Sequence, residues 1–185
     1  NTPVPNNSVR ANIIGSINAN NRMWGKYANV AGNINGFNWN AYGSFKNAGD
    51  YKNKFDGNVL NSRFNEKNFG GYVGLNKRWG YSHLLFSNFN QHLGMVEGER
   101  DANGNFILDG YTINDELKNS RKPLVPNQSV NHTKIALDNS LSFNNGGRLT
   151  ALIGFQQNQR KEFGEPDNPD EPEAFFDLKT VNYSA

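Results

Sequence analysis

The sequence predicts an all-β protein whose strands run antiparallel, up and down, in a β-barrel of about eight strands. Apolar and polar residues alternate at period two through segments of about ten residues, which is the pattern of a strand with two unlike faces. Helical periodicity is nearly absent, and only residues 113–118 could form a helical turn. Tight turns and long connections also alternate along the chain. The length of 185 residues fits a single domain over residues 1–185.

The first three strands are expected at residues 10–19, 25–34 and 37–46, after a lead-in at residues 1–9. The second and third are joined by an Asn-Gly pair at residues 35–36, the strongest short hairpin signal. The alternation is clearest in the third strand, where one side carries Phe37, Trp39, Ala41, Gly43 and Phe45 and the other carries Asn38, Asn40, Tyr42, Ser44 and Lys46. We expect the apolar side to face outward and the polar side to line a lumen.

Five further strands complete the predicted sheet. They are expected at residues 67–77, 81–93, 131–143, 148–158 and 175–183. Tight turns join the first of these strands to the second and the third to the fourth. The faces of the strand at residues 81–93 are not assigned, because Leu84 and Phe86 lie on one side while Leu85 and Phe89 lie on the other.

The connections fall into two classes at opposite ends of the strands. Long loops are expected at residues 47–66, 94–130 and 161–174, and all three lie at one end of an up-and-down sheet. Outer-membrane barrels have this asymmetry, with short periplasmic turns and longer extracellular loops. A connection as long as the second loop is unusual in a compact soluble domain. The expected fold is therefore a transmembrane β-barrel with its long loops outside.

The composition agrees with a barrel that has a polar lumen. Hydrophobic residues make up 36% of the chain and aromatic residues 12%, and the mean hydropathy is −0.76. The aromatic content distinguishes the chain from a disordered one. No segment approaches the roughly 18 apolar residues of a membrane helix, so strands would have to span the bilayer. A secreted β-sandwich that binds glycans through exposed Trp and Tyr side chains is an alternative.

Charge and residue types argue against several functional classes. The net charge is +2, and the Lys and Arg residues are scattered, which does not favour nucleic-acid binding. The absence of cysteine excludes disulfides and thiolate chemistry. No catalytic triad and no carboxylate pair at catalytic spacing is visible. We expect no enzyme, no catalytic residue, no metal site and no cofactor.

The residues expected to bind a ligand lie where the longest loop begins. His92 is the best placed of the three histidines, because it is near the rim and could meet haem or a metal chelate. Glu97, Glu99, Arg100 and Asp101 follow it and could clamp a ligand or hold a cation. Asp101 opens the stretch DANGN, which resembles part of a calcium loop but lacks its final Glu, so a plain turn is the alternative.

Four stretches of the chain form a succession of motifs. A strand ends in AGDY within residues 24–51, and a loop with NS-x-F precedes a Gly-rich strand within residues 57–80. QHLGMVEGERDANGNF at residues 91–106 has the character of a long outer loop, and GFQQNQRKEF at residues 154–163 that of a strand leaving a membrane. This succession resembles the N-terminal part of the barrel in TonB-dependent receptors of the Bacteroidetes type.

The resemblance implies a segment of a larger barrel in the bacterial outer membrane, with a plug domain elsewhere in the polypeptide. The implied function is energy-coupled uptake of a scarce nutrient, with ferric siderophore or haem favoured over oligosaccharide or peptide. The implied partners are outer-membrane lipid, the TonB complex acting through the plug, and a small-molecule or metal-chelate ligand. A surface lipoprotein over the loops is a further candidate partner. The alternative is a complete small outer-membrane barrel with a structural or adhesion role.

Overall fold

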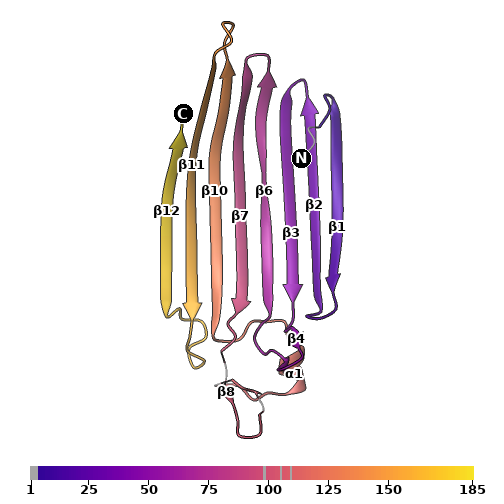
Figure 1. Cartoon of the computed structure of the whole chain (residues 1–185), viewed down its shortest axis with the longest axis vertical. Helices are drawn as coiled ribbons and strands as arrows, with labels where there is room; N and C mark the ends of the chain where they lie inside the picture. The colour runs from indigo at the N-terminus through magenta and orange to yellow at the C-terminus, as the bar shows by residue number, and fades with distance from the viewer. Residues whose placement is uncertain (1–3, 98, 105, 109) are drawn as a thin grey trace.

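Eight long strands form one antiparallel sheet, and each strand lies beside the long strand that precedes or follows it in sequence (Figure 1). The computed structural model describes residues 4–97, 99–104, 106–108 and 110–185. The all-β class and the up-and-down order of eight strands are confirmed. In sheet order the strands are β1 (Ser8–Asn18), β2 (Met23–Ile34), β3 (Phe37–Ala48), β6 (Phe64–Lys77), β7 (Gly80–Gly94), β10 (Asn127–Ser142), β11 (Arg148–Phe163) and β12 (Ala174–Ser184).

Most strands are longer than the alternation predicted. The largest difference is in β11, which continues past residue 158 to Phe163 and pairs there with the beginning of β10. Both sides of the hairpin are polar in this part, so the alternation fades although the backbone pairs continue. β1 begins at Ser8, inside the expected lead-in, and Val9 continues the apolar side of the strand.

The tight turns lie together at one end of the sheet. In the β2–β3 turn, Asn35 and Gly36 have φ angles of 50° and 83°, and two positive φ angles are what a type I′ hairpin turn requires. A side chain at Gly36 would overlap the carbonyl of Asn76 in the neighbouring turn. The Asn-Gly signal in the sequence therefore predicted this hairpin correctly.

The three long connections lie together at the other end (Figure 1). Each is shorter than expected, and they span residues 49–63, 95–126 and 164–173. The first contains the hairpin of β4 (Lys52–Asn53) and β5 (Gly57–Asn58), and the second contains the hairpin of β8 (Glu99–Arg100) and β9 (Phe106–Ile107). The second also contains α1 (Asp115–Asn119), which confirms the predicted helical turn. In the described residues, no helix is long and apolar enough to cross a membrane.

The large sheet is a single layer that remains open. β1 and β12 each pair with one neighbour and not with each other, so the eight strands do not close on themselves. Few apolar side chains are buried in the described part of the chain, and most of these belong to the loops, namely Val59, Leu60, Leu108 and Val125. No second large sheet packs on the first in the described residues. The β-sandwich alternative is therefore wrong, because a sandwich needs a core between two sheets.

Candidate functional site

The strand register sorts the side chains of the large sheet onto two unlike faces. Residues that pair across neighbouring strands point to the same side, so each face can be followed from β1 to β12. We call the side that carries Phe37 and Trp39 the apolar face, and the side that carries Asn38 the polar face. The pairing also assigns β7, whose Leu84 and Phe86 lie on the apolar face.

Two rows of paired residues cross the apolar face without a charged or amide side chain. One row is Val9, Gly32, Trp39, Val73, Leu84, Leu137, Ile153 and Tyr183. The next row is Ala11, Val30, Ala41, Gly71, Phe86, Ile135, Phe155 and Val181. These rows, together with the apolar residues that adjoin them on the same face, are called the apolar band.

No described residue covers the apolar band. Ile13 in β1 is 85% exposed, and Ile153, in a strand with neighbours on both sides, is still 54% exposed. Soluble monomers rarely expose a continuous apolar patch larger than a few hundred Å², and this band crosses every strand of the sheet. The band is therefore a surface made to be covered by an apolar medium or an apolar partner.

The border of the apolar band nearest the loops shifts from strand to strand. In β3 the last apolar residue on this side is Phe45, whose partner in β6 is Lys67, so the apolar stretch of β6 ends earlier, at Phe69. Phe69 in turn pairs with Asn88, and the apolar stretch of β7 ends earlier again, at Phe86. The band therefore runs obliquely across the strands, toward the end that carries the tight turns.

The polar face borders a hollow of about 1190 Å³ whose lining extends from β1 to β11. A hollow shared by strands so far apart in the sheet means that the sheet is concave on this side. The lining includes several amides and phenols, namely those of Asn12, Tyr27, Asn29, Asn38, Asn40, Tyr42, Tyr72 and Asn76. These groups can hydrogen-bond with water, so the concave side suits a hydrated space.

Aromatic side chains on the polar face make specific contacts. Tyr27 and Tyr42 stack with ring centroids 6.4 Å apart. His83 stacks on Tyr81 with ring centroids 4.9 Å apart, and the Tyr81 hydroxyl donates to Asp138 Oδ1 at 3.3 Å. These contacts hold the rings over the concave surface, where they could stack on a ligand.

Two glycines of β6 make room for these rings. A side chain at Gly74 would overlap the His83 ring, and one at Gly70 would crowd the Tyr42 hydroxyl. Tyr42 and His83 come from the strands on either side of β6. The Gly-rich pattern of this strand therefore has a packing reason, since it lets bulky neighbours lie across the sheet.

A buried ion pair fixes the first loop at the rim of the sheet. Asp50 follows β3 and Arg63 precedes β6, and both side chains are fully buried. Arg63 Nε donates to Asp50 Oδ1 at 2.9 Å, and Arg63 Nη2 donates to Asp50 Oδ2. Arg63 Nη1 also donates to the carbonyl of Leu117 at 3.0 Å. The pair thus connects the two strand ends to the second loop.

Asn61 holds the two ends of the second loop together. Its amide nitrogen donates to the carbonyls of Met95 at 3.0 Å and Pro126 at 2.7 Å, which lie at opposite ends of this loop. Its Oδ1 accepts from the Leu124 backbone nitrogen at 2.9 Å. With Asp50 and Arg63, Asn61 forms what we call the rim cluster.

Two more arginines attach the second loop to the sheet. Arg22 donates to Asn119 Oδ1 at 2.8 Å and to the Lys118 carbonyl at 3.1 Å. Arg121 donates to the Asn47 carbonyl at 2.9 Å. These contacts reach from the β1–β2 turn and β3 to the helical part of the loop, so this loop is folded onto the rim.

His92 lies at the rim but not over the concave surface. The register puts it on the apolar face, beside Asn65 and Ser129 and beyond the loop-side border of the apolar band. Its Nε2 lies 2.8 Å from Asn127 Oδ1. A ligand in the hollow would therefore not meet this histidine.

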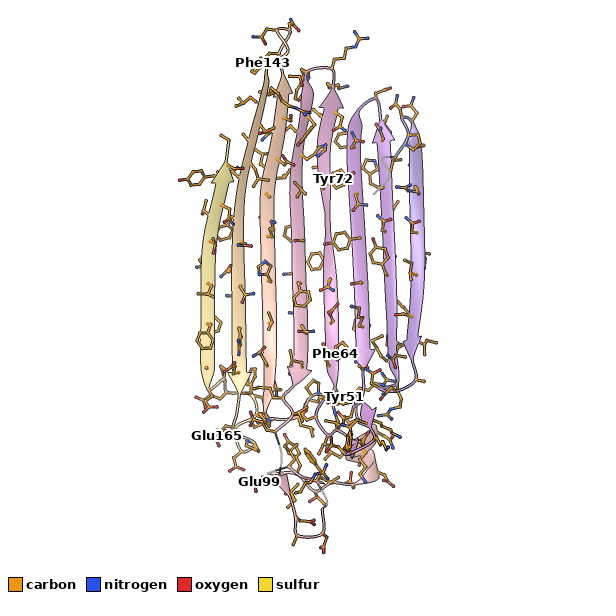
Figure 2. The ribbon with its side chains drawn as sticks, viewed as in Figure 1. Tyr51, Phe64, Tyr72, Glu99, Phe143 and Glu165 are labelled. Carbon is orange, nitrogen blue, oxygen red and sulfur yellow. The ribbon has the colours of Figure 1, made fainter. Side chains whose placement is uncertain are left out.

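The other four predicted binding residues lie together in the second loop. Glu99 and Arg100 form β8 and are exposed, as is Glu97, and Figure 2 shows Glu99 among the loops beyond the strand ends. Arg100 forms an ion pair with Asp56 of the first loop. Asp101 Oδ1 accepts from a backbone nitrogen of the DANGN turn at 2.9 Å. Arg100 thus joins two loops, and His92 is separate from this group.

The electrostatics of this region are those of an exposed loop contact. A hydrogen bond from Asn53 and the ion pair with Arg100 lower the pKa of Asp56. Within the described residues, no group of three or more His, Asp or Glu side chains is arranged to hold a metal ion. Asn105 of the DANGN stretch lies outside the described residues, and the described part of that stretch forms a turn.

No protein-family model, curated protein or solved structure matches this chain.

Proposed function

We propose that this chain forms part of the wall of a bacterial outer-membrane β-barrel, with the apolar face against lipid and the polar face toward a hydrated lumen. We further propose that the barrel is a TonB-dependent receptor that imports a scarce nutrient, with ferric siderophore or haem favoured over oligosaccharide or peptide. The observation that carries the first proposal is the uncovered apolar band across all eight strands. The second rests on the resemblance and on the concave polar surface.

The height of the apolar band supports a bilayer as its surroundings. In β3 the band extends from Phe37 to Phe45, which is about 26 Å along a strand that rises about 3.3 Å per residue. With the tilt estimated below, the height across a membrane is about 22 Å, close to the apolar band of about 25 Å in outer-membrane barrels.

The oblique course of the band supports strands that are tilted to the membrane. Across the six spacings from Ile17 in β1 to Phe155 in β11, the loop-side border moves by six residues along the strands. This shift is about 20 Å over a sheet width of about 29 Å, taking strands about 4.8 Å apart. The corresponding tilt is about 35°, at the lower end of the 35–45° of outer-membrane barrels.

The open edges support a segment of a larger barrel. β1 and β12 each leave one edge without a partner in the described sheet, and a membrane-spanning sheet must satisfy such edges by pairing with further strands. A complete small barrel would pair β1 with β12, and no observation favours that alternative. In the larger barrel the long loops would face outward, and the tight turns would face the periplasm.

Depth-dependent quenching tests the membrane proposal. Trp39 lies in the apolar band, so brominated phosphatidylcholine should quench its fluorescence in the intact protein that carries this chain, with every other tryptophan replaced by Phe. The matched control removes Trp39 as well and introduces Tyr42→Trp on the polar face, where the same lipid should quench weakly. Equal quenching of both reporters, or none of Trp39, would refute the proposal.

Nutrient limitation tests the receptor proposal separately. A strain that lacks the protein should lose growth on a ferric siderophore or on haem as the only iron source, and regain it when the gene is restored. Loss of growth on an oligosaccharide or a peptide alone would place the nutrient in the less favoured classes. Growth unchanged on all of these nutrients would refute an uptake function.

A further inference from the structure

Most charged side chains of the apolar face lie on the loop side of the apolar band. In the eight long strands, the charged residues on this face are Lys26, Lys67, Lys77, Lys161, Asp177 and Lys179. Lys77 lies at the opposite end, where its Nζ donates to the Asn35 carbonyl at 2.6 Å. The other five lie toward the long loops, at different distances from the band. Lys26 pairs with Phe45 at the end of the band in β3, and Lys67 is the next residue on this face after Phe69. Lys161, Asp177 and Lys179 lie beyond Phe155 and Val181, the last apolar residues of the band in β11 and β12.

Three of these lysines lie over aromatic rings. The Nζ atom of Lys26 is 5.2 Å from the centre of the Trp24 ring, and that of Lys67 is 6.0 Å from the Phe45 ring. Trp24 and Phe45 also contact each other, with ring centroids 5.0 Å apart. The four side chains therefore form one continuous cluster across β2, β3 and β6.

The third lysine repeats the arrangement near the other edge of the sheet. Lys161 in β11 has its Nζ 5.6 Å from the centre of the Phe175 ring in β12. Its partner in β10 is Ser129, so it lies at the same rim as the first cluster. The pattern of a lysine over an aromatic ring therefore recurs, but six residues beyond Phe155, where the band ends in β11, whereas Lys26 and Lys67 adjoin the band.

These three lysines carry positive charge that no described carboxylate neutralises. Lys26, Lys67 and Lys161 are exposed, and none forms an ion pair within the described residues. On the polar face, by contrast, Lys46 pairs with Glu66 at 3.0 Å. The border thus presents positive charge next to an apolar surface, which complements a ligand with an anionic head and apolar tails.

We infer that Lys26 and Lys67, which adjoin the border of the apolar band, bind the phosphate groups of anionic lipid headgroups in the leaflet on the loop side. This inference rests on the proposed position of the apolar band in a bilayer. Lysine stems extend over apolar surface while their ammonium groups reach the headgroup level, and aromatic rings occupy the same level. Lys26 and Lys67 both pair with Phe45 across the sheet, so they are about 10 Å apart, two strand spacings.

Trp24 provides the reporter for the test. In the intact protein, with every other tryptophan replaced by Phe, quenching of Trp24 by brominated phosphatidylglycerol is compared with quenching by brominated phosphatidylcholine. A single lysine near an anionic surface favours binding by about fivefold, so the anionic lipid should reach half-maximal quenching at a mole fraction about fivefold lower. The variant Lys26→Gln/Lys67→Gln should abolish this preference, whereas Lys134→Gln on the polar face should retain it.

The outcomes separate this inference from the membrane proposal. Equal quenching of Trp24 by both lipids would overturn the headgroup site and leave the membrane proposal standing, since lipid still reaches the ring. No quenching by either lipid would overturn both. A loss of preference in Lys134→Gln would attribute the effect to net charge and also overturn the site. If the double variant fails to fold, Lys26→Gln alone must reduce the preference for the inference to stand.

Discussion

Replacing Arg63 with Met leaves the Asp50 carboxylate buried without its cation. Both side chains are fully buried, and removal of one partner from a buried ion pair costs about 3–5 kcal/mol, because the remaining charge has neither water nor a counter-ion. Arg63 also donates to the Leu117 carbonyl, so the loss should fall on the attachment of the second loop. Neither side chain takes part in the backbone pairing of the large sheet, so the sheet should keep its stability.

Hydrogen exchange measures this loss locally. A cost of 3–5 kcal/mol corresponds to exchange that is roughly 10²- to 4 × 10³-fold faster in peptides covering residues 95–126, provided that these amides exchange through opening of the loop. Peptides from β2 and β3 serve as the internal reference and should be unchanged. Arg100→Met is the matched control, because its ion pair with Asp56 is exposed to solvent and exposed pairs contribute little.

A second variant separates the effect of the unpaired buried charge from the effect of the changed side-chain size at residue 63. In Asp50→Asn/Arg63→Met no charge remains buried, so part of the lost protection should return, as expected when a buried pair is removed as a whole. Wild-type exchange in the Arg63→Met loop would refute the anchoring role. So would an equal loss of protection in β2 and β3, because the pair would then stabilise the sheet rather than the loop.

Three further predictions concern the faces and the loops. Leu137→Arg should lower the free energy of unfolding from bilayers by about 2–4 kcal/mol, measured by urea titration, and a cost no larger than that of an arginine on the polar face would contradict the lipid contact. Gly74→Val should lower the denaturation midpoint more than Gly15→Val, because the added side chain meets the His83 ring at the first position and nothing within 4 Å at the second; equal midpoints would contradict this packing. Because the pKa of Asp56 is lowered in the folded protein, its ion pair stabilises the loops above the ordinary carboxyl pKa and is lost as pH falls through the folded pKa. Hydrogen exchange in residues 52–58, corrected for the intrinsic rate, should therefore rise over that acidic range and stay constant near neutrality.

The strands could be predicted because most of them have one apolar face and one polar face. Period-two alternation is strong wherever the two faces differ, as in β3, and the Asn-Gly turn fixed the register of the second hairpin. The prediction failed where both faces are polar, as in residues 159–163 of β11, because equal faces leave no alternation. The open edges of the sheet could not be predicted either, since the pairing of β1 with a partner depends on residues far away in sequence.

The rim cluster was not predicted, although a signal was present. AGDY and NSRF contribute to the resemblance to TonB-dependent receptors, but that resemblance does not indicate that Asp50 and Arg63, the charged residues within them, form an ion pair. Ala48 and Phe64 pair as the last residues of β3 and the first of β6, so Asp50 and Arg63 lie just beyond two adjacent strand ends. Opposite charges at such positions indicate an ion pair that closes the loop. By contrast, the face on which His92 lies depends on the register of β7 with its neighbouring strands. The polar residues around His92 in the sequence do not reveal this register.

The surroundings of the sheet must account for three of its properties at once. The apolar face is uncovered, the polar face is concave, and both edge strands lack a second partner in the described structure. A soluble partner on the apolar face would account for the first property alone and would not explain why the band crosses the strands obliquely. The barrel-wall proposal accounts for all three, because lipid covers the band, water fills the hollow, and further strands pair with β1 and β12. The same proposal gives the lysines at the loop-side border a reason to lie beside aromatic rings rather than beside carboxylates.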